Sequence, residues 1–280
     1  MNETRPPNPR RYKLTVAYDG SAFHGWQKQM PPDKPWPRTV QGELERALMH
    51  VLRRPSAEID LLGASRTDAG VHALGQVCHL SADTTIPLDR LCRAINRRLP
   101  DDVEARAVEE VHPEFDAIAD AMAKQYRYRV LNAPHRPLGM RHLVYHEPAT
   151  LDLDAMRDAA ARLVGEHDLA GLAAAAHGRS TTVRTIHACD VEAHALPPGY
   201  AADVDDAANG RELHVVISGN GFLYHTVRIV AGTLVDVGLG RRPPEVIDEI
   251  FSTNDRRLAG PTLPPHGLCL EWVKHRTGGA

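Results

Sequence analysis

The order of hydrophobic patterns along the chain constrains its fold more strongly than any other feature. "YKLTVAYDG" alternates like a strand that ends in a turn, and apolar residues from Val40 to Val51 recur at helical spacing. Strands are predicted near residues 58–62 and 76–80, "PLDRLCRAINRRLP" is predicted to be a second helix, and "DVEARAVEEV" alternates like a closing strand. This β-α-β-β-α-β order is that of the ferredoxin-like fold.

The second part of the chain repeats this order. It begins with a predicted strand "KQYRYRVL" and a helix "LDAMRDAAARLVG", for which Asp152 is the expected N-cap and Gly165 the expected stop. Strands are then predicted near 183–191 and 212–218. A long helix from about Phe222, a shorter helix after Pro244 and a last strand "LCLEWV" complete this part. We therefore predict an α+β fold of two ferredoxin-like (βαββαβ) halves. They are expected to join into a continuous, mainly antiparallel sheet with helices packed on one side and a central cleft, where large sites commonly lie.

The 280 residues divide by composition into an arm and two halves. The proline-rich, polar start "MNETRPPNPRR" predicts a flexible N-terminal arm over residues 1–11. The N-terminal half is expected over 12–115 and the C-terminal half over 116–280.

Composition excludes several classes of protein and site. No apolar run is long enough to cross a bilayer and no signal core follows a charged start, so we expect a cytoplasmic protein without membrane contact. The four cysteines form no C-x-x-C pair, which predicts reduced thiols, and the 16 histidines form no H-E-x-x-H pair, so no metal site is predicted. "GNGF" lacks the third glycine of a dinucleotide fingerprint and no phosphate-binding G-x-x-x-x-G-K-[ST] occurs, so no cofactor is expected.

The summed charge offers no general attraction for a polyanion, because 33 basic residues face 36 acidic ones. A nucleic-acid partner would need local basic patches. The candidates are Arg5, Arg10, Arg11, Lys13, Arg53, Arg54, Lys124, Arg127, Arg129, Arg179 and Arg184, each of which is otherwise read as part of a solvated face.

One stretch, "GASRTDAGVHALGQ" at residues 63–76, reads as a site. It sets a lone charge pair among glycine, alanine and small polar residues, and extended backbone points Arg66 and Asp68 to the same side. A carboxylate beside a guanidinium stays ionised and is a competent nucleophile, but spacing and charge alone favour the alternative of a structural turn with a salt bridge. A third possibility, a two-carboxylate hydrolase, needs Asp19 to lie near Asp68.

An ordered set of motifs resembles the tRNA pseudouridine synthase A (TruA) family along nearly the whole chain. "RTDAGVHALGQ" from Arg66 resembles the family signature. "YDGSAFHGWQKQ", "KQYRYRVL", "VRTI", "NGFLYHTVRIVAG" and "GLCLEW" follow the family's order and match in kind. The resemblance implies a homodimeric enzyme with two joined ferredoxin-like halves that isomerises uridine to pseudouridine in the anticodon stem-loop of tRNA, at positions 38–40, without a cofactor.

The resemblance also implies roles for five residues. Asp68 matches the family nucleophile, and whether it attacks C6 or C1′ or acts as a base stays open. Arg66 matches the arginine that fills the space left by a flipped-out uridine, and Tyr126 the tyrosine that stacks on that base. Arg228 matches an arginine near the catalytic carboxylate, although a pairing with some structural carboxylate is an alternative, and Leu268 an apolar residue against the target base.

Two departures from the family pattern put RNA contacts in question. Ser65 stands where glycine is usual before R-T-D, and Ile118 stands where arginine is common. The competing class of function is a non-catalytic RNA-binding module, because ferredoxin-like sheets with exposed aromatics also bind RNA without altering it.

Overall fold

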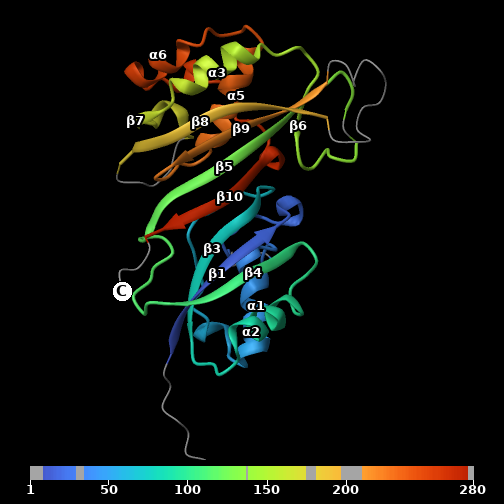
Figure 1. Cartoon of the computed structure of the whole chain (residues 1–280), viewed down its shortest axis with the longest axis vertical. Coiled ribbons are helices and arrows are strands. Elements are labelled where there is room, and N and C mark those ends of the chain that lie inside the picture. The colour runs from blue at the N-terminus through green and yellow to red at the C-terminus, as the bar shows by residue number, and fades with distance from the viewer. Residues whose placement is uncertain (1–8, 30–34, 137, 175–180, 197–209, 277–280) are drawn as a thin grey trace, which may run out of the picture. The chain divides into compact units, whose positions relative to one another are not determined.

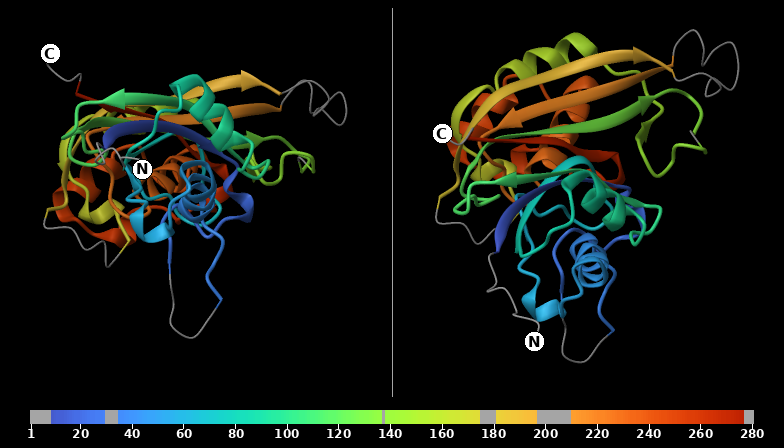
Figure 2. Two further views of the ribbon diagram at one scale, coloured as in Figure 1. Left: turned by 90° about the horizontal axis from the view of Figure 1, so that it is seen from below. Right: turned by 60° about the horizontal axis from the view of Figure 1, so that its bottom comes forward.

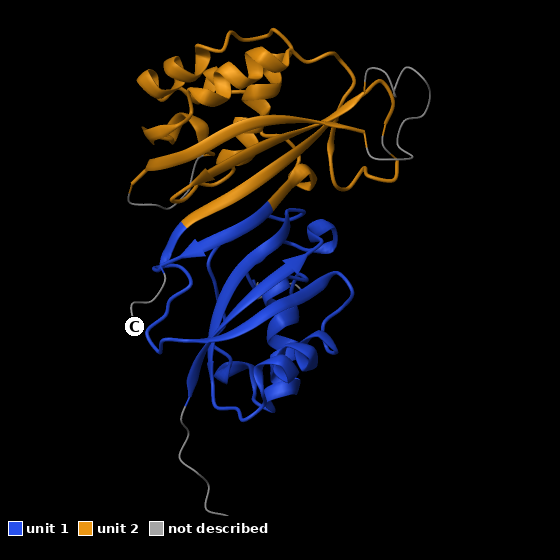
Figure 3. Cartoon of the chain, in the orientation of Figure 1, with its two compact units in different colours: residues 1–122, 270–280 blue, residues 123–269 orange. Residues whose placement is uncertain are grey.

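The computed structural model describes residues 9–29, 35–136, 138–174, 181–196 and 210–276. The chain forms two compact units, residues 1–122 with 270–280 and residues 123–269 (Figure 3). The predicted division after residue 115 differs from this, because the last strand returns to the first unit. Gly75 permits that return, since a Cβ there would lie 2.4 Å from the carbonyl oxygen of Glu271.

The first unit follows the predicted β-α-β-β-α-β order and adds the final strand of the chain. Its elements are β1 (Arg10–Tyr18), α1 (Val40–Leu52), β2 (Leu62–Gly63), β3 (His72–Ala82), α2 (Leu88–Asn96), β4 (Val103–Val111) and most of β10 (Leu268–His275). The strands lie in the order β4-β1-β3-β10, with the short β2 beside β3, and β1 is antiparallel to both β3 and β4.

Helix α1 forms where the apolar spacing predicted it. The hydroxyl of Thr39 accepts a hydrogen bond from the N–H of Gly42 and caps the first turn, while Val40, Leu44 and Leu48 are buried. The helix ends at Arg53, whose φ of 54° is left-handed. Figure 2 shows α1 nearly end-on beside the strands, and α1 packs against α2, which packs on β4.

Two predictions for the first unit were wrong in their bounds. The strand expected near 58–62 is reduced to the two residues of β2, and a 3-10 turn covers Ser56–Glu58. The carbonyl of Leu61 accepts from the side chain of Gln41 at 2.9 Å. The N-terminal arm is also shorter than predicted, because Arg10 and Arg11 belong to β1. Both residues pair with β3, and Arg11 also pairs with β4.

The second unit is also built on an antiparallel sheet. It comprises β5 (Ala121–Asn132), β6 (Tyr145–Glu147), α3 (Leu153–Ala161), β7 (Gly165–Asp168), β8 (Val183–Ala195), β9 (Arg211–Gly219), α5 (Thr226–Gly238) and α6 (Val246–Thr253). The strand order is β5-β9-β8-β7, with antiparallel pairing of β5 with β9, β9 with β8 and β8 with β7. The unpredicted β6 pairs with β5 in parallel. Helices α3, α5 and α6 gather on one side of these strands (Figure 1).

Local signals explain where the helices of the second unit begin. The carboxylate of Asp152 accepts from the N–H groups of Asp154 and Ala155, both at 3.0 Å, which confirms the predicted cap of α3. Helix α5 begins at Thr226 rather than at Phe222, because His225 has a φ of 65° that no α-helical residue adopts. His225 therefore precedes the helix that carries Arg228 and Gly232.

The predicted fold class is confirmed: helices and mostly antiparallel strands make an α+β fold. All four cysteines fall within the described ranges and are free thiols, and burial raises the pKa of Cys78 and Cys189. Among the described helices, none combines the length and the apolar character needed to span a bilayer.

His79 gives the first unit a pH dependence. Its Nδ1 accepts a hydrogen bond from the N–H of Ala117 at 2.8 Å, and burial, followed by the charge of Arg11, lowers its pKa below 6.5. The unfolded chain thus takes up this proton at a higher pH than the folded chain. The associated stability is present above about pH 6.5 and is lost as pH falls below it. We expect His79→Asn, which keeps an acceptor but cannot titrate, to flatten the decline in unfolding free energy between about pH 7 and 5. Urea titrations of both proteins measure this decline, and equal slopes would contradict it.

Candidate active site

The loop over residues 64–71 is held from one side by buried polar contacts. Gln76, fully buried on β3, donates from Nε2 to the carbonyl of Ser65 at 2.6 Å and accepts from the N–H of Ser65 at 3.2 Å. Ser65 and Thr67 are buried, whereas Arg66 between them is exposed and Asp68 is half-buried. The predicted alternation is thus present, and it turns the two charged residues toward the accessible side of the loop.

Thr67 anchors the middle of the loop. Its hydroxyl lies 2.7 Å from the hydroxyl of Tyr18, a buried pair, and its carbonyl accepts from the N–H of Trp26 at 3.1 Å. Gly25 lets the two backbones approach, since it has a φ of 91° and a Cβ there would lie 2.5 Å from the carbonyl oxygen of Thr67. The backbone on which Asp68 stands is therefore fixed one residue before it.

A turn fixes the loop on the other side of Asp68. The carbonyl of Asp68 accepts from the N–H of Val71 at 3.2 Å, and Gly70 supplies the positive φ of 80° that the turn needs. The N–H of Gly70 donates to the carbonyl of Phe23 at 3.2 Å. Side-chain and backbone contacts thus hold both flanks of Asp68, the pre-organisation that a reacting carboxylate requires.

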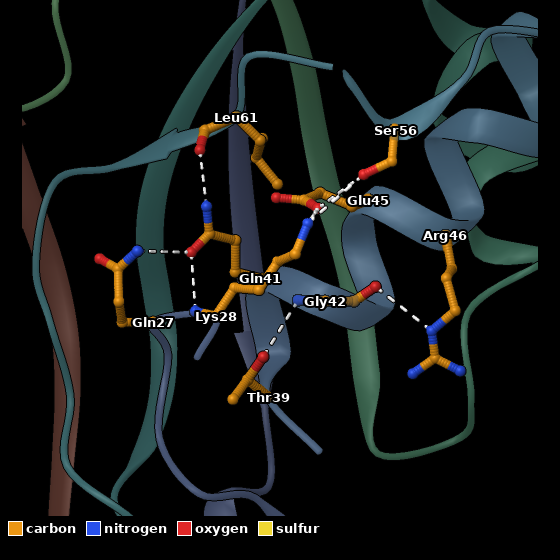
Figure 4. A network of polar contacts seen from close by, with 9 residues as sticks. All are labelled: Gln27, Lys28, Thr39, Gln41, Gly42, Glu45, Arg46, Ser56 and Leu61. Carbon is orange, nitrogen blue, oxygen red and sulfur yellow. Dashed lines mark hydrogen bonds and ion pairs between the residues drawn. The ribbon is translucent and has the colours of Figure 1, made fainter. Parts of the chain in front are cut away.

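Behind the loop, a second polar network holds the segment that contains Trp26 (Figure 4). The side-chain oxygen of the buried Gln41 accepts from the Gln27 side chain at 3.0 Å and from the N–H of Lys28 at 2.9 Å. Lys28 pairs with Glu45 on α1 at 2.5 Å. Helix α1 therefore holds the segment of Trp26, Gln27 and Lys28 in place. The N–H of Trp26 in turn bonds the carbonyl of Thr67 in the loop.

Asp19, the other carboxylate of the hydrolase alternative, belongs to a turn of its own. Its carboxylate accepts from the N–H of Ser21 at 2.9 Å and lies 3.2 Å from His72 Nδ1. These contacts give Asp19 the role of capping the 3-10 turn Gly20–Ala22.

In the second unit, Tyr126 and Tyr128 project to the same side of β5. Tyr126 is 7% exposed, and Phe222 packs against it edge-on, with ring centroids 5.4 Å apart and an interplanar angle of 89°. Tyr128 is fully buried, its hydroxyl donates to the carbonyl of Pro264 at 2.8 Å, and burial raises its pKa against the opposing charge of Arg228. The burial of Tyr128 and its bond to Pro264 give this tyrosine a structural role in the sheet.

The segment before β10 connects Arg228 to this tyrosine pair. Arg228 donates from Nε to the carbonyl of Leu263 at 2.7 Å, and the N–H of Leu263 donates back to the carbonyl of Arg228 at 3.3 Å. A Cβ on Gly267 would lie 2.7 Å from the Tyr128 ring, and Leu268, 6% exposed, follows directly. Tyr126, Arg228 and Leu268 therefore belong to one group in the second unit, while Arg66 and Asp68 belong to the first.

Several basic residues proposed as RNA patches are engaged in ion pairs within the chain. Arg10 lies 2.7 Å from Glu110, Lys13 3.1 Å from Glu109, and Arg54 3.0 Å from Glu58. Arg129 lies 2.5 Å from Glu212. Arg5 and Arg179 fall outside the described residues. The pairs of Arg10 and Arg54 are exposed and therefore weak, so they reduce the local positive field more than they stabilise the fold.

Sequence reasoning did not identify the residues that support the loop: Tyr18, Gly25, Trp26, Gln41 and Gln76. Gln76 ends the quoted signature, ten residues after Arg66, and its uncharged amide between apolar strand positions is the one signal that could have revealed it. The others reach the loop from segments far away in the chain, which no local pattern encodes.

Gln76 provides a test of how the loop is held. We expect Gln76→Met to lower the free energy of unfolding by about 2 kcal/mol or more, because it removes both hydrogen bonds that Gln76 makes to the buried backbone of Ser65. The same substitution at the half-buried Gln27, which donates one bond to Gln41, is expected to cost less than about 1 kcal/mol. Urea unfolding of both variants measures the difference, and equal costs would show that Gln76 does not anchor the loop.

Comparison with known proteins places these motifs in a family context. The model of a family described as tRNA pseudouridine synthase matches residues 14–118 and 159–275. Proteins named tRNA pseudouridine synthase A are similar over most of their length. The one from Geobacillus sp. is 40% identical over 261 residues, which is 93% of this chain and 96% of the relative. Those of Bacillus subtilis and Brevibacillus brevis are 40% and 41% identical, over 93% of this chain and 97% and 98% of their own lengths.

Proposed function

The chain belongs to the tRNA pseudouridine synthase family, and from this membership we propose that it isomerises uridine to pseudouridine in the anticodon stem-loop of tRNA, with Asp68 as the nucleophile. The observation that carries the proposal is the match of the family model to the stretch containing Asp68, together with the anchored, half-buried position of that carboxylate.

The proposed reaction requires a nucleophile and a pocket for the base. The bond between N1 of the base and C1′ is broken, the ring turns, and C5 is joined to C1′, so no atoms are gained or lost. The Asp68 carboxylate, held on the anchored loop, can add to C6, attack C1′ or remove a proton at C2′, so Asp68 carries out the first step in each of these routes. We propose that the exposed Arg66 fills the space that the flipped nucleotide leaves.

The target uridine has to leave the base stack before it can react, at a cost of a few kcal/mol. We propose that Tyr126 stacks on the flipped base, a contact worth about 1–3 kcal/mol, which offsets much of that cost. The packing of Phe222 supports this role because it fixes the plane of the Tyr126 ring. Tyr126 lies between the two stretches that the family model matches, so its role rests on the "KQYRYRVL" motif.

Arg228 and Leu268 complete the proposed site. We propose that Arg228 orients Asp68, and that Leu268 contacts the target base. The bond from Arg228 Nε to Leu263 supports the role of Arg228, because it restricts the direction of a long side chain. We further propose a cytoplasmic homodimer, in which two copies would supply a longer basic track than one near-neutral chain offers.

Replacing the nucleophile tests the chemistry. We expect Asp68→Asn to bind tRNA with unchanged affinity and to lose at least about a thousandfold in kcat, since the amide is isosteric but not nucleophilic. The exposed Asp101→Asn is the control and is expected to keep full turnover. Tritium release from C5-labelled uridine measures conversion, and filter binding measures affinity.

Undiminished conversion by Asp68→Asn would disprove the nucleophile assignment. Binding without conversion in the unmodified protein would favour the non-catalytic RNA-binding module, and release of free base would favour a hydrolase.

The proposed stacking role separates the ring of Tyr126 from its hydroxyl. Tyr126→Phe is expected to keep most activity, whereas Tyr126→Ala is expected to lose about 1–3 kcal/mol of stabilisation of the flipped state, or roughly 5- to 150-fold in kcat/KM. Tyr128→Phe is the matched control: it removes the bond to Pro264 and is expected to lower stability without lowering turnover per folded molecule. Equal losses in Tyr126→Phe and Tyr126→Ala would show that the hydroxyl matters instead.

A further inference from the structure

Five charged or titratable side chains meet on one face of the sheet in the second unit. Residues Glu192 and His194 come from β8, Glu212 and His214 from β9, and Arg129 from β5, and the register pairs Glu192 with His214, His194 with Glu212, and Arg129 with His214. The face is the one turned away from α3, because the alternating β8 residues Cys189 and Val191 are buried and α3 packs on β8. Figure 1 shows β8 and β9 below α3.

Three of these side chains offer ligand atoms close enough for one metal ion. The ligand atoms of Glu192, His194 and His214 all lie within 4.8 Å of one another. Nε2 of His194 and a carboxylate oxygen of Glu192 are 3.2 Å apart, and the two imidazole rings have centroids 4.3 Å apart. Two ligand atoms about 2.0–2.1 Å from a tetrahedral zinc ion are separated by about 3.3 Å. The distance between Nε2 of His194 and the Glu192 oxygen already matches this separation. His194 and Glu192 are about half exposed, which leaves room for the remaining adjustment.

The fourth side chain, Glu212, orients one of the histidines. Its carboxylate accepts from Nε2 of His214 at 2.7 Å and from Nε of Arg129 at 2.5 Å, and it is 5% exposed. Since a carboxylate oxygen can only accept, Nε2 of His214 carries the hydrogen, and Nδ1 of the neutral ring keeps its lone pair for a metal. A carboxylate behind a histidine ligand is the usual second layer of a metal site.

We propose that Glu192, His194 and His214 bind a divalent transition-metal ion of the Zn²⁺ class, with Glu212 and Arg129 holding His214 in position. Two imidazoles and one carboxylate suit Zn²⁺, Co²⁺ or Ni²⁺ rather than Mg²⁺ or Ca²⁺, which prefer oxygen ligands. The ion would join β8 to β9 near their ends at Ala195 and Arg211. The proposal is independent of the uridine chemistry, because none of these residues belongs to the proposed active site.

The test is a metal titration of the full-length chain without a polyhistidine tag. We expect isothermal calorimetry to show one equivalent of Zn²⁺ bound per chain and no comparable binding of Mg²⁺. Cobalt should give the intense visible absorption of a four-coordinate site. His194→Ala and His214→Ala are each expected to weaken Zn²⁺ binding by at least about a hundredfold, and Glu212→Gln by about 10- to 100-fold. Zn²⁺ is also expected to raise the melting temperature of the unmodified protein but not that of His194→Ala.

The matched control is His187→Ala, which removes an exposed histidine of the same strand that lies outside the cluster and is expected to leave Zn²⁺ binding unchanged. Binding that His194→Ala and His187→Ala weaken equally would overturn the proposal, as would the lack of a stoichiometric Zn²⁺ site. His214→Ala could fail to fold. His194 is exposed, so His194→Ala is expected to fold and tests the proposal by itself.

Discussion

The pair of hydrogen bonds between Gln76 and the backbone of Ser65 is the constraint on which the proposed chemistry depends. It secures the start of the loop to β3, and the contacts of Thr67 with Tyr18 and Trp26 secure its middle. An exposed arginine and a half-buried aspartate then project from a backbone that cannot rearrange cheaply, because every anchor is a buried polar group whose loss is costly. A rigid support of this kind is what the proposed chemistry requires of the loop.

Local patterns were enough to predict most elements of the fold. The apolar spacing of α1, the Asp152 cap and the alternation of β4 and β9 each depend on residues within one element. The failures lie where a tertiary contact or a single backbone conformation decides the bounds of an element. The strand near 58–62 is cut short where the carbonyl of Leu61 bonds a side chain of α1, and α5 starts late because His225 takes a left-handed conformation. Neither effect leaves a periodic trace in the sequence.

The same distinction applies to the proposed active site. Arg66 and Asp68 were identified from their own motif, since two charges among small residues are conspicuous. The supporting groups Tyr18, Gly25 and Trp26 lie about 40 to 50 residues earlier in the chain and meet the loop only in the folded unit. Ser65 stands where the resemblance led us to expect glycine, and its backbone groups bond Gln76, which does not depend on the side chain at position 65.

The proposed metal site, formed by Glu192, His194 and His214, has ligands that a search for contiguous metal motifs does not detect. His194 and His214 are 20 residues apart and are brought together only by the register of β8 on β9. On antiparallel strands, ligands at i and i+2 of one strand and opposite them on the next share a face, so a three-ligand set needs no recognisable spacing. What separates this cluster from a chance gathering of charges is Glu212: a buried carboxylate that both orients one imidazole and is itself held by Arg129. A solvated surface has no need of that second layer, whereas a metal site does.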